Sequence, residues 1–237
     1  MNLQDEISSF LERTAVFPPR YNIKNWYSEQ NPVFPINYIE LCNIPEPVLG
    51  MLKADSEFSD IWNHIEDTPK QYYFQHLLID PDFKTVGNSN WKHEHYHALP
   101  KRFPEPETVK PTAYLNSFTD HFFKCFPNIV KAVYYKMEPG CIVRPHLDAE
   151  SHKYAICHVP LSGGDETEYY CWGEKFKFYA GKYYYLNAGL THAVYHPITA
   201  KENRINLLVV QKLDKPVTEQ LLENVNNIKA FCKSYVK

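Results

Sequence analysis

The sequence predicts a mainly β protein, a sandwich or jelly roll flanked by helices. About eight short runs rich in β-branched and aromatic residues follow one another between residues 128 and 213. Turn signals such as EPG, SGGD and NAG separate these runs, and no helical stretch lies between them. A parallel α/β sheet would need a helix between successive strands, so this pattern favours a sandwich or jelly roll.

The first half of the chain predicts supporting helices and strands. We expect an amphipathic helix at residues 2–13 and a strand in NYIELCNI, residues 37–44. A short helix should run from Pro47 to about Lys53, because proline suits the first helical turn. QYYFQHLLID, residues 71–80, predicts a further strand.

A second supporting helix is predicted within residues 111–127, between two prolines. Its apolar residues recur at helical spacing: Tyr114, Leu115, Phe118, Phe122 and Phe123. The stretch KRFPEPETVK before it reads as a solvated loop.

The strands of the second half are read from their β-branched and aromatic content. They are NIVKAVYYKM, CIVRPHLD, YAICHVPL, TEYYCW, KFKFYA, KYYYLN, HAVYHPI and RINLLVVQKL. The tyrosine runs in them fit half-buried strands better than a surface that stacks bases.

A closing amphipathic helix follows, with five residues expected to face inward: Leu221, Leu222, Val225, Ile228 and Phe231.

We expect one domain over residues 1–237. Helices and strands of residues 1–127 would support the barrel and its substrate mouth, residues 128–213 would form the core, and residues 214–237 the C-terminal helix. The chain is 44% hydrophobic and 15% aromatic, which is enough for a sizeable core.

Charge and cysteine content restrict the class of function. The formal charge of −3 disfavours a nucleic-acid partner, although it leaves room for a local basic groove. No apolar run approaches the roughly 20 residues of a membrane span, and the N-terminus lacks a signal-peptide pattern. Six scattered cysteines without a CxxC pair predict reduced thiols, so we expect a cytoplasmic location.

His146 and Asp148 are the first candidates for a metal site. Two residues apart on a strand, they would point to the same face. Later strands add three more histidines, His158, His192 and His196. Two histidines and one carboxylate form the ligand set of non-haem Fe(II) oxygenases, which leaves positions open for a co-substrate and dioxygen.

A longer pattern strengthens this interpretation. The segments MEPGCIVRPHLD, CHVPL, GKYYYLNAGLTHAVYHP and NRINLLVV, in this order, resemble the Fe(II)/2-oxoglutarate-dependent oxygenases. The likeness is greatest to the aspartyl/asparaginyl β-hydroxylase-like group, with amino-acid and prolyl hydroxylases as neighbours. It covers residues 128–213 and implies a double-stranded β-helix, the cupin-like jelly roll.

The resemblance implies a role for six residues. His146, Asp148 and His192 would bind Fe(II), and Arg204 would bind the distal carboxylate of 2-oxoglutarate, a task that suits the guanidinium fork. His158 and Tyr135 occupy positions that help to bind this co-substrate in relatives. The implied reaction uses dioxygen to decarboxylate 2-oxoglutarate to succinate and to hydroxylate a C–H bond.

The chain departs from the family pattern at two places. Relatives often carry arginine two residues before the histidine of the His-x-Pro-Leu strand, where this chain has Ile156. The spacing from His192 to Arg204 is twelve residues rather than about ten, which keeps His196 as an alternative ligand. The segment LTHAV matches the family pattern around the distal ligand, which favours His192 over His196 as that ligand.

Other clusters are weaker candidates. His93, His95 and His97 alternate in a polar stretch that reads more readily as a solvated patch than as a zinc site, or as part of the substrate mouth. A set of four near the proposed site lacks the close pairing of structural zinc ligands, which favours buried thiols: Cys141, His152, Cys157 and Cys171. LSGGDE reads as a β-turn.

The sequence thus favours an Fe(II)/2-oxoglutarate dioxygenase that hydroxylates an amino-acid side chain, free or in a peptide or protein. Two alternatives stay open. One is a non-catalytic jelly-roll binding module, and the other is a related oxygenase acting on a nucleic acid or another small molecule.

Overall fold

The computed structural model describes residues 38–57, 63–64, 72–80, 103–146, 148, 153–171, 174–190 and 192–236. The side chains of residues 57, 63–64 and 144–146 lie outside this description. The helix expected at residues 2–13, the histidines 93, 95 and 97, and His152 lie outside it as well.

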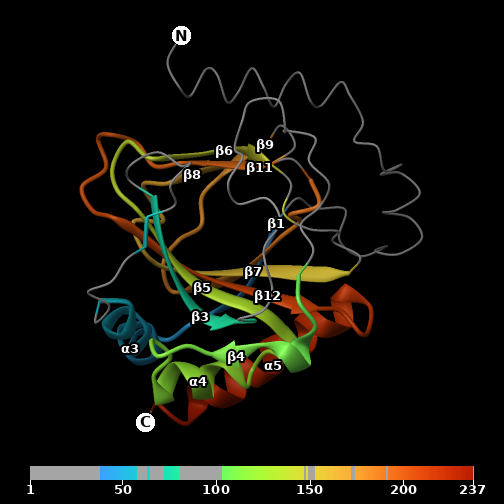
Figure 1. The fold of residues 1–237 in the computed structure, drawn as a ribbon. Helices are drawn as coiled ribbons and strands as arrows, with labels where there is room; N and C mark the ends of the chain where they lie inside the picture. Colours follow the sequence, from blue (N-terminus) through green and yellow to red (C-terminus); the bar gives the residue numbers. More distant parts are fainter. Residues whose placement is uncertain are drawn as a thin grey trace.

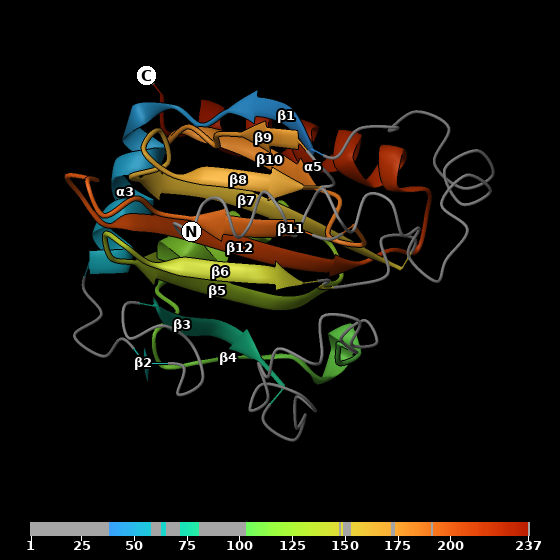
Figure 2. The same ribbon diagram turned by 90° about the horizontal axis from the view of Figure 1, so that it is seen from above.

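The protein folds as a double-stranded β-helix of two stacked sheets (Figure 1). The larger sheet has the order β1 (Tyr38–Asn43), β10 (Lys182–Leu186), β7 (Tyr154–Ser162), β12 (Arg204–Lys212), β5 (Ile129–Met137), β3 (Tyr72–Ile79) and β2 (Asn63–His64), with β4 (Lys110–Pro111) paired to β3. The smaller has the order β6 (Ile142–His146), β11 (His192–Tyr195), β8 (Glu168–Cys171) and β9 (Glu174–Phe176). Strands of the two sheets run in similar directions, with β1 at one edge and β2 and β4 near the other (Figure 2).

Alternation along β12 separates an inner from an outer face of the larger sheet. Leu207 and Val209 belong to the main core, which the helices cover. Leu208 and Val210 point the other way, toward the smaller sheet, and pack with Ile156. Because strand residues alternate between faces, Arg204 and Asn206 share the inner side with Leu208 and Val210.

Three helices cover the outer face beneath the larger sheet (Figure 1). They are α3 (Glu46–Glu57), α4 (Ser117–Phe123) and α5 (Val217–Lys233), and the short 3₁₀ helix η2 (Pro106–Thr108) precedes β4. Aromatic rings join the last two, with the centroids of Phe122 and Phe231 5.5 Å apart. This layer covers the outer face of the larger sheet, so the inner face that carries Arg204 and Asn206 is turned toward the smaller sheet.

The strand predictions after residue 128 are confirmed, and so are the strands at Tyr38–Asn43 and Tyr72–Ile79. The expected short helix is α3, which runs on to Glu57. SGGD forms the predicted turn after β7. The strand KFKFYA is shorter than expected, because pairing ends at Phe176.

Three local predictions were wrong. Helix α4 begins at Ser117, because the side chain of Asn116 accepts a hydrogen bond from the Thr119 N–H and caps it, so Tyr114 and Leu115 precede the helix. Leu222 of α5 is 59% exposed, and the polar Asn224 is buried instead. The tyrosine run of β10 is buried on both faces rather than on one, since helices cover one side of this strand and the second sheet covers the other.

In the described part of the chain, every helix is too short or too polar to cross a membrane.

Candidate active site

Strands β6 and β11 bring the predicted metal ligands together. In their antiparallel register the Cα of His192 pairs with the Cα of His146, and directly opposed positions lie on one face of a sheet. Asp148 follows β6, and its backbone N–H donates to the carbonyl oxygen of Ala188 at 3.0 Å. Its Oδ2 lies 3.5 Å from Nε2 of His192. The fold therefore brings His192 beside the backbone position of His146 and the carboxylate of Asp148, more than 40 residues earlier in the sequence.

A backbone hydrogen bond fixes the tautomer of His192. Nδ1 lies 2.9 Å from the carbonyl oxygen of Leu190. A carbonyl can only accept, so Nδ1 donates its hydrogen, and in the neutral ring Nε2, the nitrogen nearer Asp148, carries the lone pair. A histidine that donates one nitrogen to a carbonyl and turns the other toward a carboxylate has the arrangement of a metal ligand.

His196 is engaged differently. Its Nε2 lies 2.8 Å from the carbonyl oxygen of Glu202, and its Nδ1 lies 3.0 Å from the hydroxyl oxygen of Thr167. The residue is fully buried. With both ring nitrogens in hydrogen bonds to the protein, His196 ties the loop after β7 to the loop before β12.

Arg204 opens β12 and is only 3% exposed. Its Nη1 donates to Sδ of Met137 at 3.1 Å, and its Nη2 donates to the hydroxyl oxygen of Tyr169, whose ring centroid lies 5.1 Å from Cζ. Its Nε has no hydrogen-bond partner, and no carboxylate among the described residues pairs with it. A buried guanidinium with only neutral partners is costly unless an anion binds to it.

His158 lies beside this cation and is neutral. Burial lowers its pKa to about 3, and the charge of Arg204 adds to the effect. Its Nδ1 lies 3.2 Å from Nδ2 of Asn206, an N–H donor, so Nδ1 accepts and Nε2 carries the hydrogen. Nε2 has no partner in the protein although the residue is only 6% exposed. Arg204 and His158 thus offer two unused donors, a suitable pair for one carboxylate.

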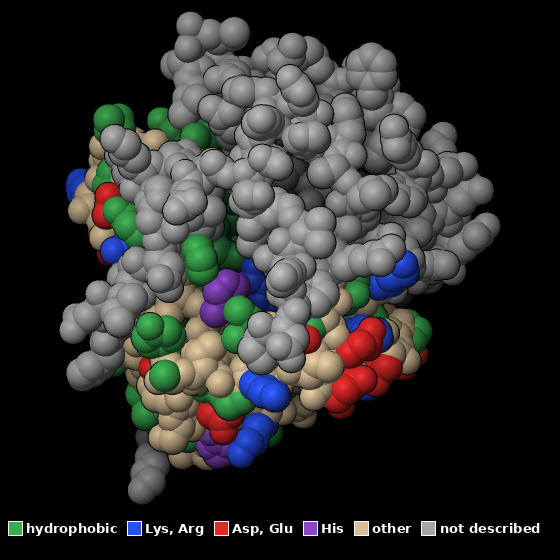
Figure 3. Space-filling model, viewed as in Figure 1, with side chains coloured by type: hydrophobic (Ala, Val, Ile, Leu, Met, Phe, Trp, Pro, Cys, Tyr) green, Lys and Arg blue, Asp and Glu red, His purple; other side chains and the backbone are tan. Residues whose placement is uncertain are grey.

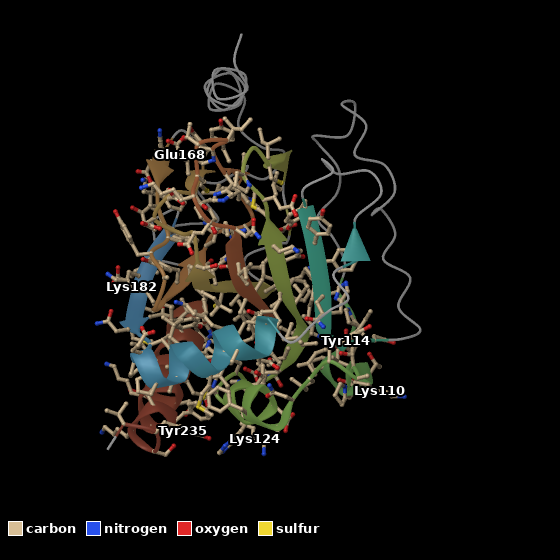
Figure 4. The ribbon with its side chains drawn as sticks, turned by 90° about the vertical axis from the view of Figure 1, so that its left-hand side faces the viewer. Lys110, Tyr114, Lys124, Glu168, Lys182 and Tyr235 are labelled. Atoms are coloured by element: carbon tan, nitrogen blue, oxygen red, sulfur yellow. The ribbon has the colours of Figure 1, made fainter. Side chains whose placement is uncertain are left out.

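Apolar side chains surround these polar groups and exclude water. One cluster contains Tyr72, Met137, Tyr169 and Phe178, and the other contains Ile156, Ala188 and Leu208. Ile156 is 2% exposed, so the position where relatives carry arginine forms part of the apolar wall. Figure 4 shows the side chains that fill the space between the sheets, with Glu168 on the smaller sheet and Lys182 on the larger.

Tyr135 and Tyr169 make contacts that the sequence did not indicate. The hydroxyl oxygen of Tyr135 accepts from Nζ of Lys131 at 3.0 Å, and its ring stacks on Tyr72. Sequence reasoning missed Tyr169, the hydroxyl that contacts Arg204. Its strand parity with Cys171 was visible in the sequence, but the pairing of Cys171 with His192, which puts these positions on one face of the sheet, is shown only by the structure.

The cysteines carry no metal site in the part of the chain that is described. All six are free, and Cys141, Cys157 and Cys171 are buried. Burial raises the pKa of Cys141 and of Cys157 to about 12, so both are neutral thiols. Among the described side chains, which exclude that of His146, no three histidine, cysteine or carboxylate groups converge.

Comparison with known proteins gave structural likenesses alone. No family model matches the sequence, and no curated protein matches it. A 2OG-Fe(II) oxygenase family oxidoreductase from Burkholderia pseudomallei is 13% identical, with a TM-score of 0.45 over 81% of this chain and 91% of the other. A prolyl-4-hydroxylase from Pseudomonas putida is 12% identical, with a TM-score of 0.40 over 81% and 97%. A cupin 2 conserved barrel domain protein from Leptotrichia buccalis is 25% identical, with a TM-score of 0.29 over 37% and 36%.

Proposed function

We propose that the protein is an Fe(II)/2-oxoglutarate-dependent dioxygenase that hydroxylates a C–H bond of an amino-acid side chain, free or in a polypeptide. The observation that carries this proposal is the buried Arg204, which has neutral partners and an unused Nε on the inner face of the barrel. A diacid co-substrate supplies the anion that this site lacks.

The residues fit the metal that this function requires. His192 has its tautomer set by Leu190, its Nε2 lies near a carboxylate oxygen of Asp148, and its strand position faces that of His146. In the proposal these two histidines and Asp148 hold Fe(II). When bound, the iron would supply the redox chemistry with dioxygen and 2-oxoglutarate, while the protein supplies the ligands and a dry cavity.

The chain's own residues have separate tasks in this proposal. The Arg204 guanidinium and the His158 Nε2–H bind the distal carboxylate of 2-oxoglutarate. Tyr169 holds Arg204 through its hydroxyl, and Asn206 holds His158 in the tautomer that donates. The apolar wall around Ile156 and Leu208 keeps water from the reacting carbon.

Succinate release tests the proposal. The purified protein is incubated without oxygen with Fe(II) and 2-oxoglutarate, oxygen is admitted, and succinate is measured over a broad panel of amino acids and peptides. We expect succinate from the wild type and none from His146→Ala. Wild-type succinate no higher than that of His146→Ala throughout the panel would instead favour the non-catalytic binding module.

A further inference from the structure

A second cation lies on the inner face, and the proposed chemistry does not use it. Lys131 of β5 pairs with Val210 of β12, so both positions lie on the face that looks toward the smaller sheet. The lysine is partly buried. Arg204 pairs with Met137, six residues further along β5. At 3.3 Å per residue the backbone positions of residues 131 and 137 are roughly 20 Å apart along the strand, and the Lys131 side chain extends from its position toward Tyr135, whereas Arg204 contacts Met137.

The ammonium group of Lys131 has neutral partners. Its Nζ donates to the hydroxyl oxygen of Tyr135 at 3.0 Å and lies 5.7 Å from the centroid of that ring. Among the described residues, none of the carboxylates pairs with it. A partly buried ammonium that lacks a counter-ion is a favourable site for an anion.

The surroundings of Lys131 suit a carboxylate joined to an apolar body. The Tyr135 hydroxyl accepts from Lys131 and keeps its own hydrogen for a second bond. The Tyr135 ring stacks on Tyr72 at 5.3 Å, and Phe74 packs edge-on against His76 at 4.9 Å. Nδ1 of His76 has no hydrogen-bond partner. Burial, followed by the Lys131 charge, lowers the pKa of His76 to about 3, so its neutral ring brings no positive charge of its own.

In Figure 3 the described part of one face of the molecule carries hydrophobic, basic, acidic and histidine side chains next to one another.

We propose that Lys131 and Tyr135 bind a carboxylate of the substrate, which makes the substrate a carboxylic acid with an apolar or aromatic portion. Its catalytic consequence rests on the proposed dioxygenase function. The inference moves Tyr135 from the co-substrate, where the sequence resemblance assigned it, to the substrate. The carboxylate belongs either to a free amino acid or to a peptide with a terminal or side-chain carboxylate.

Matched pairs of ligands test the inference directly. The probes are the standard free L-amino acids and their C-terminal amides, together with short peptides that carry or lack a side-chain carboxylate. Binding to the metal-free protein is followed by ligand-observed NMR, and stimulated succinate release is followed in the Fe(II) and 2-oxoglutarate assay. We expect acids to bind and amides to fail, and Lys131→Met to weaken acid binding at least ~10-fold through loss of a charge-assisted hydrogen bond.

Lys136→Met is the matched control, since it removes the same charge from the same strand. Lys136 pairs with Ile205 on the other face, with its Nζ 4.5 Å from the centroid of the Tyr73 ring. We expect this variant to bind the acids as the wild type does. Binding that is equal with and without a carboxylate in both ligand series, or acid binding unchanged in Lys131→Met, would overturn the inference.

The two readouts separate this inference from the dioxygenase proposal. Loss of 2-oxoglutarate affinity in Lys131→Met would assign the lysine to the co-substrate and also overturn the inference. Acid binding that depends on Lys131, without succinate from any acid, would support the carboxylate site and count against the dioxygenase. Free amino acids and peptide carboxylates are distinguished by which of them binds.

Discussion

At the residue scale, hydrogen bonding distinguishes His192 from His196. His192 uses Nδ1 for the carbonyl oxygen of Leu190, and its Nε2 is turned toward Asp148. His196 uses both nitrogens, for Thr167 and for the carbonyl oxygen of Glu202. A metal ligand needs a lone pair directed at the metal, and this supports His192 for that role in the proposed site.

Iron binding should therefore respond differently to the two substitutions. We expect His192→Ala to lose Fe(II) binding, measured anaerobically by equilibrium dialysis. His196→Ala should keep it but unfold at a lower urea concentration, because two buried hydrogen bonds are lost. Iron retained in His192→Ala and lost in His196→Ala would reverse the assignment.

Two histidines should make the stability depend on pH. The pKa values of His158 and His76 are lowered from 6.5 to about 3, mainly by burial. Below pH 6.5 the two histidines are protonated in the unfolded chain but stay neutral in the native protein. The free energy of unfolding is therefore greatest above pH 6.5 and falls as the pH is lowered toward 3. At pH 5 the loss is about 2 kcal/mol for each residue.

Urea unfolding at pH 7.5 and at pH 5 measures this loss. His76→Gln should remove the part of the pH dependence that comes from His76. A difference between the two pH values that is the same in His76→Gln as in the wild type would contradict the assignment.

At the scale of elements, the turn after β7 supports the start of β12. Gly163 has φ +60°, and a Cβ there would lie 2.8 Å from Cα of Arg204. A Cβ on Gly164 would lie 2.0 Å from the carbonyl oxygen of Phe178. The glycines of SGGD therefore allow three backbone segments to meet beside Arg204.

Gly164→Ala should destabilise the protein by about 3 kcal/mol, because the collision is with backbone and cannot be relieved by a side-chain rotation. Gly50→Ala is the control. It lies in α3 with nothing within 4 Å of an added Cβ, and we expect a gain of about 0.5–1 kcal/mol. Chemical denaturation measures both, and a Gly164→Ala protein as stable as the wild type would contradict this account of the turn.

Helix α5 is joined to the sheet by a buried polar network. Nδ2 of Asn224 donates to the hydroxyl oxygen of Tyr183 at 2.9 Å and to Oε1 of Gln211 at 2.6 Å, and its Oδ1 accepts from Nε2 of Gln220 at 3.2 Å. Asn224→Ala removes these three buried hydrogen bonds and leaves Oε1 of Gln211 without its donor, so we expect a loss of about 2–3 kcal/mol.

The exposed Leu222 provides the comparison on the same helix. Leu222→Ala should cost less than about 0.5 kcal/mol, since the side chain is already 59% exposed. A loss of unfolding free energy in Leu222→Ala as large as the roughly 2–3 kcal/mol expected for Asn224→Ala would contradict the exposed position of Leu222, and an equally small loss in Asn224→Ala would contradict the role of the polar network.

At the scale of the whole molecule, the proposed ligands should stabilise the fold, because they join the two sheets. With Mn(II) in place of iron and 2-oxoglutarate at 100 times its Kd, we expect about 2.7 kcal/mol. For a domain of this size that is a rise in Tm of roughly 5–10 °C. Arg204→Met should abolish the rise caused by 2-oxoglutarate, and Lys212→Met, an exposed cation on the same strand, should retain it. A rise in Tm with 2-oxoglutarate that is as large in Arg204→Met as in the wild type would show that Arg204 does not bind the co-substrate.

The sequence alone determined the strands and their order, because β-branched and aromatic runs between turn residues fix local structure through short-range preferences. It also brought out His146, Asp148 and Arg204, whose spacing is visible along the chain. It misjudged Leu222 and the start of α4, where a cap and a neighbouring sheet decide the outcome.

Only the tertiary structure could show which polar side chains are hydrogen-bonded to one another and which are left available for a ligand. The hydrogen bond of His196 to Thr167 and the contact of Tyr169 with Arg204 join segments that are distant in the sequence. That no carboxylate of the described residues pairs with Lys131 is likewise visible only in the folded chain. The physical reason is that a buried polar group is defined by its partners, and partners across a barrel are set by strand register rather than by spacing.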